Sequence, residues 1–100
     1  MDYSTQTEGK STLIRVTGEL DAVSVTELRP SLDAIAATEP GAVTVDLSGL
    51  RLIDSSGVGA LVSLFKRVRA CGGQFEVRGV QGQPLSIFRV LRLDKVFSVN

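Results

Sequence analysis

Hydrophobic residues alternate with polar ones in several short runs of the chain, and this pattern predicts β-strands. Val43–Leu47 and Phe75–Arg78 follow the two-residue period of a strand with one buried face, and Leu13–Gly18 is also strand-like. Val96–Val99 is expected to be the last strand, and Tyr3–Thr7 a first strand at the edge of a sheet. A parallel strand covered on both faces would instead show a continuous run of Val, Ile and Leu. We therefore expect a sheet that is covered on one face and open on the other.

Hydrophobic residues with helical spacing lie between the first predicted strands. The first predicted helix has Ser24 as its N-cap, because Glu27 follows at the spacing of a capping box. Its apolar stripe is formed by Val25, Leu28, Leu32 and Ile35. Pro30 lacks a backbone N–H, so it should kink this helix or move its start.

Two further helices are predicted in the C-terminal half. The second carries an apolar face made of Val58, Leu61, Val62, Phe65 and Val68. Gly72–Gly73 should end it, because glycine readily adopts the left-handed conformation of a C-cap. The third should begin near Pro84, a residue suited to a first helical turn. Its inward-facing residues are expected to be Leu85, Phe88 and Leu91.

The order of these elements predicts the topology. Strands that alternate with helices imply right-handed crossovers between mostly parallel strands. We therefore expect an α/β fold with a small, mixed and mostly parallel sheet of four or five strands. About three helices should pack on one face of that sheet. A length of one hundred residues predicts a single domain, residues 1–100.

The composition limits the chemistry of the chain. The absence of histidine excludes Ser-His-Asp and Cys-His catalysis, and one cysteine, Cys71, cannot form a thiolate metal cluster. We expect no metal, no cofactor and no enzymatic activity. Eleven basic and eleven acidic residues balance, which gives no indication of nucleic-acid binding. Without an apolar run long enough to span a bilayer, and without a signal-peptide pattern, the chain is expected to be cytoplasmic and not bound to a membrane.

The segment Asp54–Gly59 is the strongest functional candidate. It follows the strand that ends at Leu47 and begins the second helix with two hydroxyls and two glycines. Asp and Ser are preferred N-cap residues, so capping alone accounts for part of the pattern. Two glycines in a first turn, at about 1 kcal/mol each relative to alanine, suggest that a ligand, a partner's backbone or a phosphate needs room there. Composition alone leaves both interpretations open.

Phosphorylation of a serine has a specific physical rationale at this position. A phosphate adds about −1.5 to −2 charges, which the N–H groups and the dipole at a helix start tolerate. Phosphate on Ser55, beside Asp54, would make the surface strongly anionic and would disfavour a partner fitted to the neutral hydroxyl. Ser56 is the second candidate. Asp21 should lie at the same edge of the sheet as Asp54 if the strands before them are parallel.

Four segments together resemble a known family. They are Thr17–Asp21, Val45–Leu50, Ile53–Leu61 and Gly72–Gly73, in this order and spacing. The pattern is similar to that of STAS domains and, more narrowly, to free-standing bacterial anti-sigma factor antagonists. The resemblance covers nearly the whole chain and implies a small sheet with helices packed against one face.

The resemblance also implies partners and a switch. Proteins of this kind bind an anti-sigma factor that is also a serine kinase, and this binding frees a sigma factor. The kinase then phosphorylates the serine after the aspartate, here Ser55, which ends binding, and a metal-dependent serine phosphatase restores it. The expected partner-binding residues are Asp21, Ala22, Asp54, Ser56, Gly57, Val58 and Gly59.

Two other functions stay open at this point. The chain also resembles the STAS component of a lipid-transport ABC complex, in which the same helix surface would dock an ATPase constitutively. A small nucleotide-binding or hydrolytic domain is the third reading. It is weakly supported, because Glu8–Ser11 lacks the long glycine-rich approach of a phosphate-binding loop.

Overall fold

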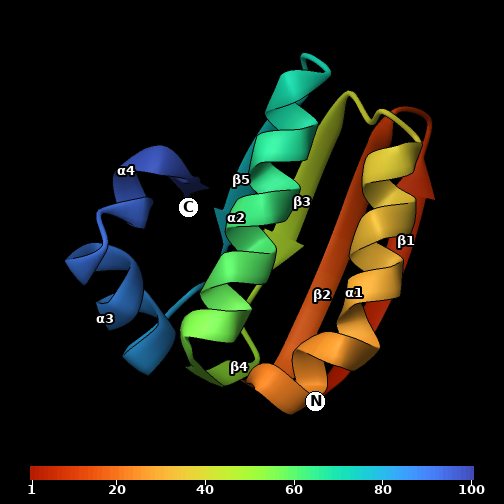
Figure 1. The fold of residues 1–100 in the computed structure, drawn as a ribbon. Coiled ribbons are helices and arrows are strands. Elements are labelled where there is room, and N and C mark those ends of the chain that lie inside the picture. Colours follow the sequence, from red (N-terminus) through yellow and green to blue (C-terminus); the bar gives the residue numbers. More distant parts are fainter.

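The computed structural model describes all residues, 1–100, and its strands form one mixed sheet (Figure 1). The strands are β1 (Asp2–Glu8), β2 (Ser11–Leu20), β3 (Ala42–Asp46), β4 (Leu50–Ile53), β5 (Gln74–Arg78) and β6 (Ser98–Val99). They follow the order β1-β2-β3-β5-β6, and β4 pairs with the end of β2 beside this path. The β1–β2 pair is antiparallel and the other four pairs are parallel. The expected α/β fold with a mostly parallel sheet is confirmed.

The helices lie on one side of the sheet and leave the other face open (Figure 1). They are α1 (Ala22–Ala37), α2 (Ser55–Ala70), α3 (Gly82–Val90) and α4 (Leu93–Val96). In Figure 1, α2 lies in the middle, with α1 on one flank and α3 and α4 on the other. Helix α1 packs against α2, and α3 packs against β4, the strand that precedes α2.

The alternation of polar and apolar residues along the strands gives the sheet one buried face and one exposed face, as expected. On β2, Ile14 and Val16 are fully buried beneath the helices, whereas Arg15 between them is exposed on the open face. Strand β5 repeats the pattern with buried Phe75 and Val77. These residues join side chains from α1, α2 and α3 in one hydrophobic core. The core thus lies between the sheet and the helices, as predicted.

The structure corrects the predicted start of the first helix. The N-cap of α1 is Asp21, and Ser24 is the third residue of the helix. The Asp21 carboxylate accepts hydrogen bonds from the N–H groups of Val23, at 3.1 Å, and Ser24, at 2.9 Å. The Ser24 hydroxyl oxygen accepts one in return from the Asp21 N–H at 2.8 Å. This reciprocal capping box sets the helix start, and Pro30 lies inside the helix without displacing that start.

Two elements were not predicted, namely β4 and α4. Strand β4 has only four residues, and its exposed Arg51 and Leu52 stand between two buried ones, so it does not alternate. The one-turn helix α4 includes Val96, which was predicted to begin the last strand. The prediction is wrong for Val96 and Phe97, because Phe97 is the C-cap of α4 and the strand comprises only Ser98–Val99.

The predicted inward orientation of Leu91 is also wrong. Phe88 is fully buried, but Leu91 is 52% exposed. Leu91 is the C-cap of α3, and the chain turns immediately afterwards at Arg92, whose φ is 60°. Helical spacing predicts burial only within a helix, and Leu91 lies just after the last helical residue of α3.

Asp46 is the last residue of β3, and its carboxylate is nearly buried on the open side of the sheet. Its Oδ1 accepts a hydrogen bond from the Ser48 N–H at 2.9 Å, and its Oδ2 pairs with Nε of Arg15 at 3.2 Å. Burial by itself would raise the pKa of Asp46. The hydrogen bonds from Ser48 and the Arg15 guanidinium outweigh burial and hold this pKa below its usual value of 3.8.

We expect the Asp46→Asn variant to be less stable than the wild type at neutral pH, by about 1–3 kcal/mol, since hydrogen bonds to the carboxylate are lost or weakened. A lowered pKa means that the ionised carboxylate stabilises the fold above about pH 4 and that this contribution disappears as the pH falls further. Urea titrations at several pH values should therefore show the wild type losing stability more steeply in acid. Equal acid dependence of the two proteins would contradict this assignment.

Candidate functional site

The start of α2 is fixed by the residue that follows β4. Asp54 is the N-cap, and its carboxylate accepts a hydrogen bond from the Gly57 N–H at 3.0 Å. Its own N–H donates to the carbonyl oxygen of Leu20, the last residue of β2, at 3.1 Å. The chain entering α2 is thus held to the neighbouring strand immediately before Ser55, the first residue of the helix.

The two adjacent serines differ in exposure. Ser55 is exposed, whereas Ser56 is half-buried. A hydroxyl on the first turn of a 16-residue helix faces the positive end of the helix dipole, which favours an anion at that position. Ser55 is therefore the more accessible of the two hydroxyls at this end of α2.

The two glycines of the first turn have different structural roles. A Cβ atom at Gly57 would lie 2.7 Å from Cγ1 of Ile53 and 2.8 Å from the carbonyl oxygen of Leu20. At Gly59, a Cβ atom would meet nothing within 4 Å, and this residue is exposed. The fold requires glycine at Gly57, where α2 approaches the strands closely. It does not require glycine at Gly59, which leaves open surface on the first turn.

Some of the remaining predicted partner-binding residues are buried, and the others are exposed or half-buried. Val58 is only 9% exposed and belongs to the core, so it supports the surface from below, as Gly57 does. Asp54 and Ala22 are exposed, and Asp21 is half-buried. The exposed and half-buried residues at the starts of α1 and α2 remain, and we call them the Ser55 surface. It consists of Asp21, Ala22, Asp54, Ser55, Ser56 and Gly59.

Asp21 and Asp54 are brought to one edge of the sheet by the pairing of β2 with β4. These strands are parallel, and Leu20 and Ile53 are partners at their ends. The next residue of each strand caps a helix, so the starts of α1 and α2 lie beside each other. The hydrogen bond from the Ser24 N–H, followed by that from its hydroxyl, lowers the pKa of Asp21 below its usual value. This part of the surface is accordingly anionic at neutral pH.

Gln83 was not predicted from the sequence, and it supports the edge of the sheet at the end of β4. Its side-chain amide accepts a hydrogen bond from the Ile53 N–H and donates one to the Ile53 carbonyl oxygen, both at 2.9 Å. Gln83 therefore pairs with β4 much as a neighbouring strand would, and it anchors α3 one residue before Asp54. No local pattern around Gln83 indicates this role, because it depends on the unpredicted strand β4.

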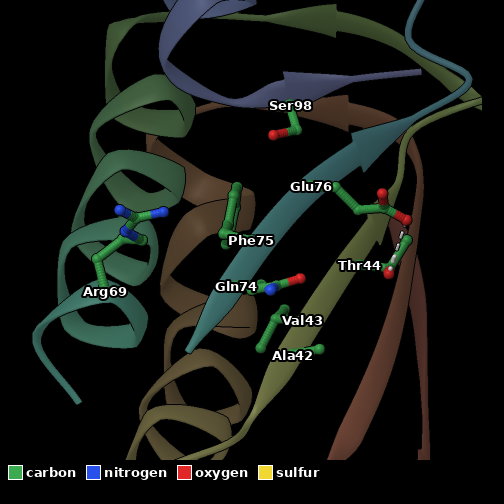
Figure 2. A pocket seen from close by; sticks show the side chains of 8 residues that line it. All are labelled: Ala42, Val43, Thr44, Arg69, Gln74, Phe75, Glu76 and Ser98. Carbon is green, nitrogen blue, oxygen red and sulfur yellow. Dashed lines mark hydrogen bonds between the residues drawn. The ribbon is translucent and has the colours of Figure 1, made fainter. Parts of the chain in front are cut away.

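One cavity lies away from the Ser55 surface. It has a volume of about 360 Å³ and is lined by residues of β3, β5, β6 and the end of α2 (Figure 2). The Thr44 hydroxyl donates to the Glu76 carboxylate at 3.2 Å along its wall, and the Asn100 amide donates to the same carboxylate at 2.8 Å. No group of three His, Cys, Asp or Glu residues lies close enough to hold a metal ion. None of the helices combines the length and apolarity needed to cross a membrane.

Comparison with known proteins gives a family and a set of related folds. A family model described as "Mlab, STAS domain" matches residues 3–99. The anti-sigma-B factor antagonist of Bacillus subtilis is 27% identical over 88 residues, which cover 87% of this chain and 79% of the relative.

Solved structures share the fold over nearly the full chain. An anti-sigma factor antagonist from Mycobacterium paratuberculosis has a TM-score of 0.85 and 24% identity, over 98% of this chain and 85% of that one. The Bacillus cell fate determinant SpoIIAA in its phosphorylated form has a TM-score of 0.80 and 19% identity, over 99% and 91% of the two chains. The anti-sigma factor antagonist SpoIIAA in its unphosphorylated form has a TM-score of 0.74 and 19% identity, over 95% of this chain and 97% of that one. Because the family model matches residues 3–99 of its 100 residues, this chain belongs to the STAS domain family.

Proposed function

We propose that the protein is an anti-sigma factor antagonist that works by partner switching. Unphosphorylated, it binds an anti-sigma factor that is also a serine kinase and thereby frees a sigma factor. Phosphorylation of Ser55 ends binding, and a metal-dependent serine phosphatase reverses the modification. The observation that carries this proposal is the exposed Ser55 at the first residue of α2, next to the N-cap Asp54.

Two comparisons support the proposal. The Bacillus subtilis relative is named an anti-sigma-B factor antagonist. SpoIIAA, whose fold this chain shares, has been solved both with and without phosphate, and both forms resemble this chain, with TM-scores of 0.80 and 0.74. In that protein, therefore, the shared fold accommodates a phosphate.

The physical effect of a phosphate on Ser55 follows from its surroundings. The N-terminal N–H groups and the dipole of α2 stabilise added negative charge, so the fold should persist. Asp54 and Asp21 border the same surface, and the phosphate adds about −1.5 to −2 charges to their two. A partner that packs against the neutral hydroxyl would lose that contact and meet a strongly anionic surface. Binding is thus switched while the fold is kept.

Incubation with a cognate anti-sigma factor kinase and Mg-ATP should place one phosphate on Ser55, because Ser55 is exposed and Ser56 is half-buried. Peptide mapping by mass spectrometry identifies the site. Ser55→Ala should abolish phosphorylation and keep binding, and Ser56→Ala is the matched control that should still be phosphorylated. Ser55→Asp should weaken binding only partly, since a carboxylate carries less charge than a phosphate.

Phosphate on Ser56 in this experiment would contradict the assignment of the site. If Ser55 stayed unmodified in protein recovered from its own host, and an ATPase co-purified with it, the constitutive subunit of an ABC complex would be the better explanation.

Alanine substitutions at the two glycines should have opposite effects. Gly57→Ala should destabilise the fold by about 1–3 kcal/mol, because its Cβ would clash with Ile53 and with the Leu20 backbone. Gly59→Ala should leave stability unchanged or raise it by up to about 1 kcal/mol, since alanine favours helix. Despite its stability, Gly59→Ala should reduce affinity for the anti-sigma factor if a partner backbone packs there. Thermal unfolding and calorimetric titration measure the two effects, and full affinity of Gly59→Ala would show that Gly59 is not part of the contact.

A further inference from the structure

The charges of the chain balance in total but are distributed unevenly along it. Residues 1–54 contain nine acidic and four basic residues, whereas residues 55–100 contain two acidic and seven basic ones. The ion pairs of the structure use Arg15, Arg51 and Arg67. The basic residues of α3, α4 and the turn between them therefore have no ion-pair partner within the protein.

The same two helices expose hydrophobic side chains. Val90 is 78% exposed, Leu91 is 52% exposed and Val96 is 50% exposed. Single exposed hydrophobic residues are normal, but three within seven positions, bordered by unpaired cations, are characteristic of a surface that binds a partner. We call this surface the basic–apolar patch. It consists of Arg89, Val90, Leu91, Arg92, Lys95 and Val96.

The backbone at Arg92 adds an independent observation. Its φ of 60° lies in the left-handed region, which glycine adopts freely and other residues adopt with strain. Glycine would make the same turn between α3 and α4 without that strain. An arginine at this position keeps a cation between the exposed Leu91 and Val96. Strained residues of this kind cluster at functional surfaces.

The basic–apolar patch lies at the end of α3 and on α4, and the first turn of α3 is tied to the strand before α2. Gln83 ties the first turn of α3 to Ile53, directly before Asp54. Figure 1 shows α3 and α4 on one flank of α2 and α1 on the other. The capped start of α1, with Asp21 and Glu27, is acidic. A protein that docks on Ser55 would therefore meet the acidic start of α1 on one side, and on the other side it would reach the basic–apolar patch by extending along α3.

We infer that the basic–apolar patch is a second contact for the anti-sigma factor, which presents to it an acidic segment carrying apolar side chains; this inference rests on the proposed function. Flanks of opposite charge fix the orientation of a partner and speed its encounter. A second copy of the chain is a poorer occupant in a symmetric contact, because the three cations outnumber the one nearby acid, Asp94, and two positively charged surfaces would face each other. An anionic membrane is also a poorer match, since the apolar side chains of the patch are one leucine and two valines and none is aromatic.

The Arg92→Gly variant separates an effect on partner binding from an effect on the stability of the fold. It should raise the thermal unfolding midpoint, because the backbone strain is relieved, and yet it should weaken binding of the anti-sigma factor by about fivefold or more at low salt. The probe is the anti-sigma factor kinase of the phosphorylation assay, titrated without ATP so that Ser55 stays unmodified. Arg78→Ala is the matched control, because it removes one exposed cation from the open face of the sheet and should leave affinity within about twofold.

A second variant, Val90→Ser combined with Val96→Ser, tests the apolar part of the patch. Both side chains are at least half exposed, so the fold should be retained while affinity falls. Unchanged affinity in this variant and in Arg92→Gly, with tight binding by the wild type, would overturn the second contact and leave the proposed function standing. A wild type that does not bind the anti-sigma factor would overturn the proposed function itself. Binding to phosphatidylserine vesicles that is lost in Arg92→Gly would assign the patch to a membrane and overturn the inference.

Discussion

The parallel pairing of β4 with the end of β2 is the contact on which the site depends. It places Leu20 opposite Ile53, so the chain leaves both strands at one edge and enters α1 and α2 side by side. Asp54 is held there by its N–H bond to the Leu20 carbonyl, and Gly57 permits the close approach of α2 that this bond requires. Without this pairing, Ser55 would lie at the end of a loop and not on a rigid helix start.

The fold could be predicted from the sequence wherever a residue pattern has a direct geometric meaning. Alternation identified β3 and β5, strand-like composition identified β2, and helical spacing identified α1, α2 and α3. The pattern failed where elements are too short to repeat. Strand β4 has four residues and α4 has one turn, so their formation depends on tertiary contacts such as the Gln83–Ile53 hydrogen bonds.

The candidate site could be singled out from the sequence, but the structural roles of its residues could not be separated. Ser55, Asp54 and Gly59 stood out because hydroxyls, a carboxylate and glycines gather at a helix start. Only the structure shows that Gly57 serves packing and Gly59 does not. The N-cap of α1 was misplaced at Ser24 because both Asp21 and Ser24 suit a capping box, and the choice between them depends on where β2 ends.

Partner switching requires that a phosphate change binding and leave the fold intact. The most direct test compares one preparation before and after stoichiometric phosphorylation of Ser55, with calorimetric titration of the anti-sigma factor and circular dichroism on the same samples. We predict that affinity falls by about tenfold or more, or at least 1.4 kcal/mol, with an unchanged spectrum and cooperative unfolding. Equal affinity before and after phosphorylation, or loss of the folded spectrum, would contradict the account.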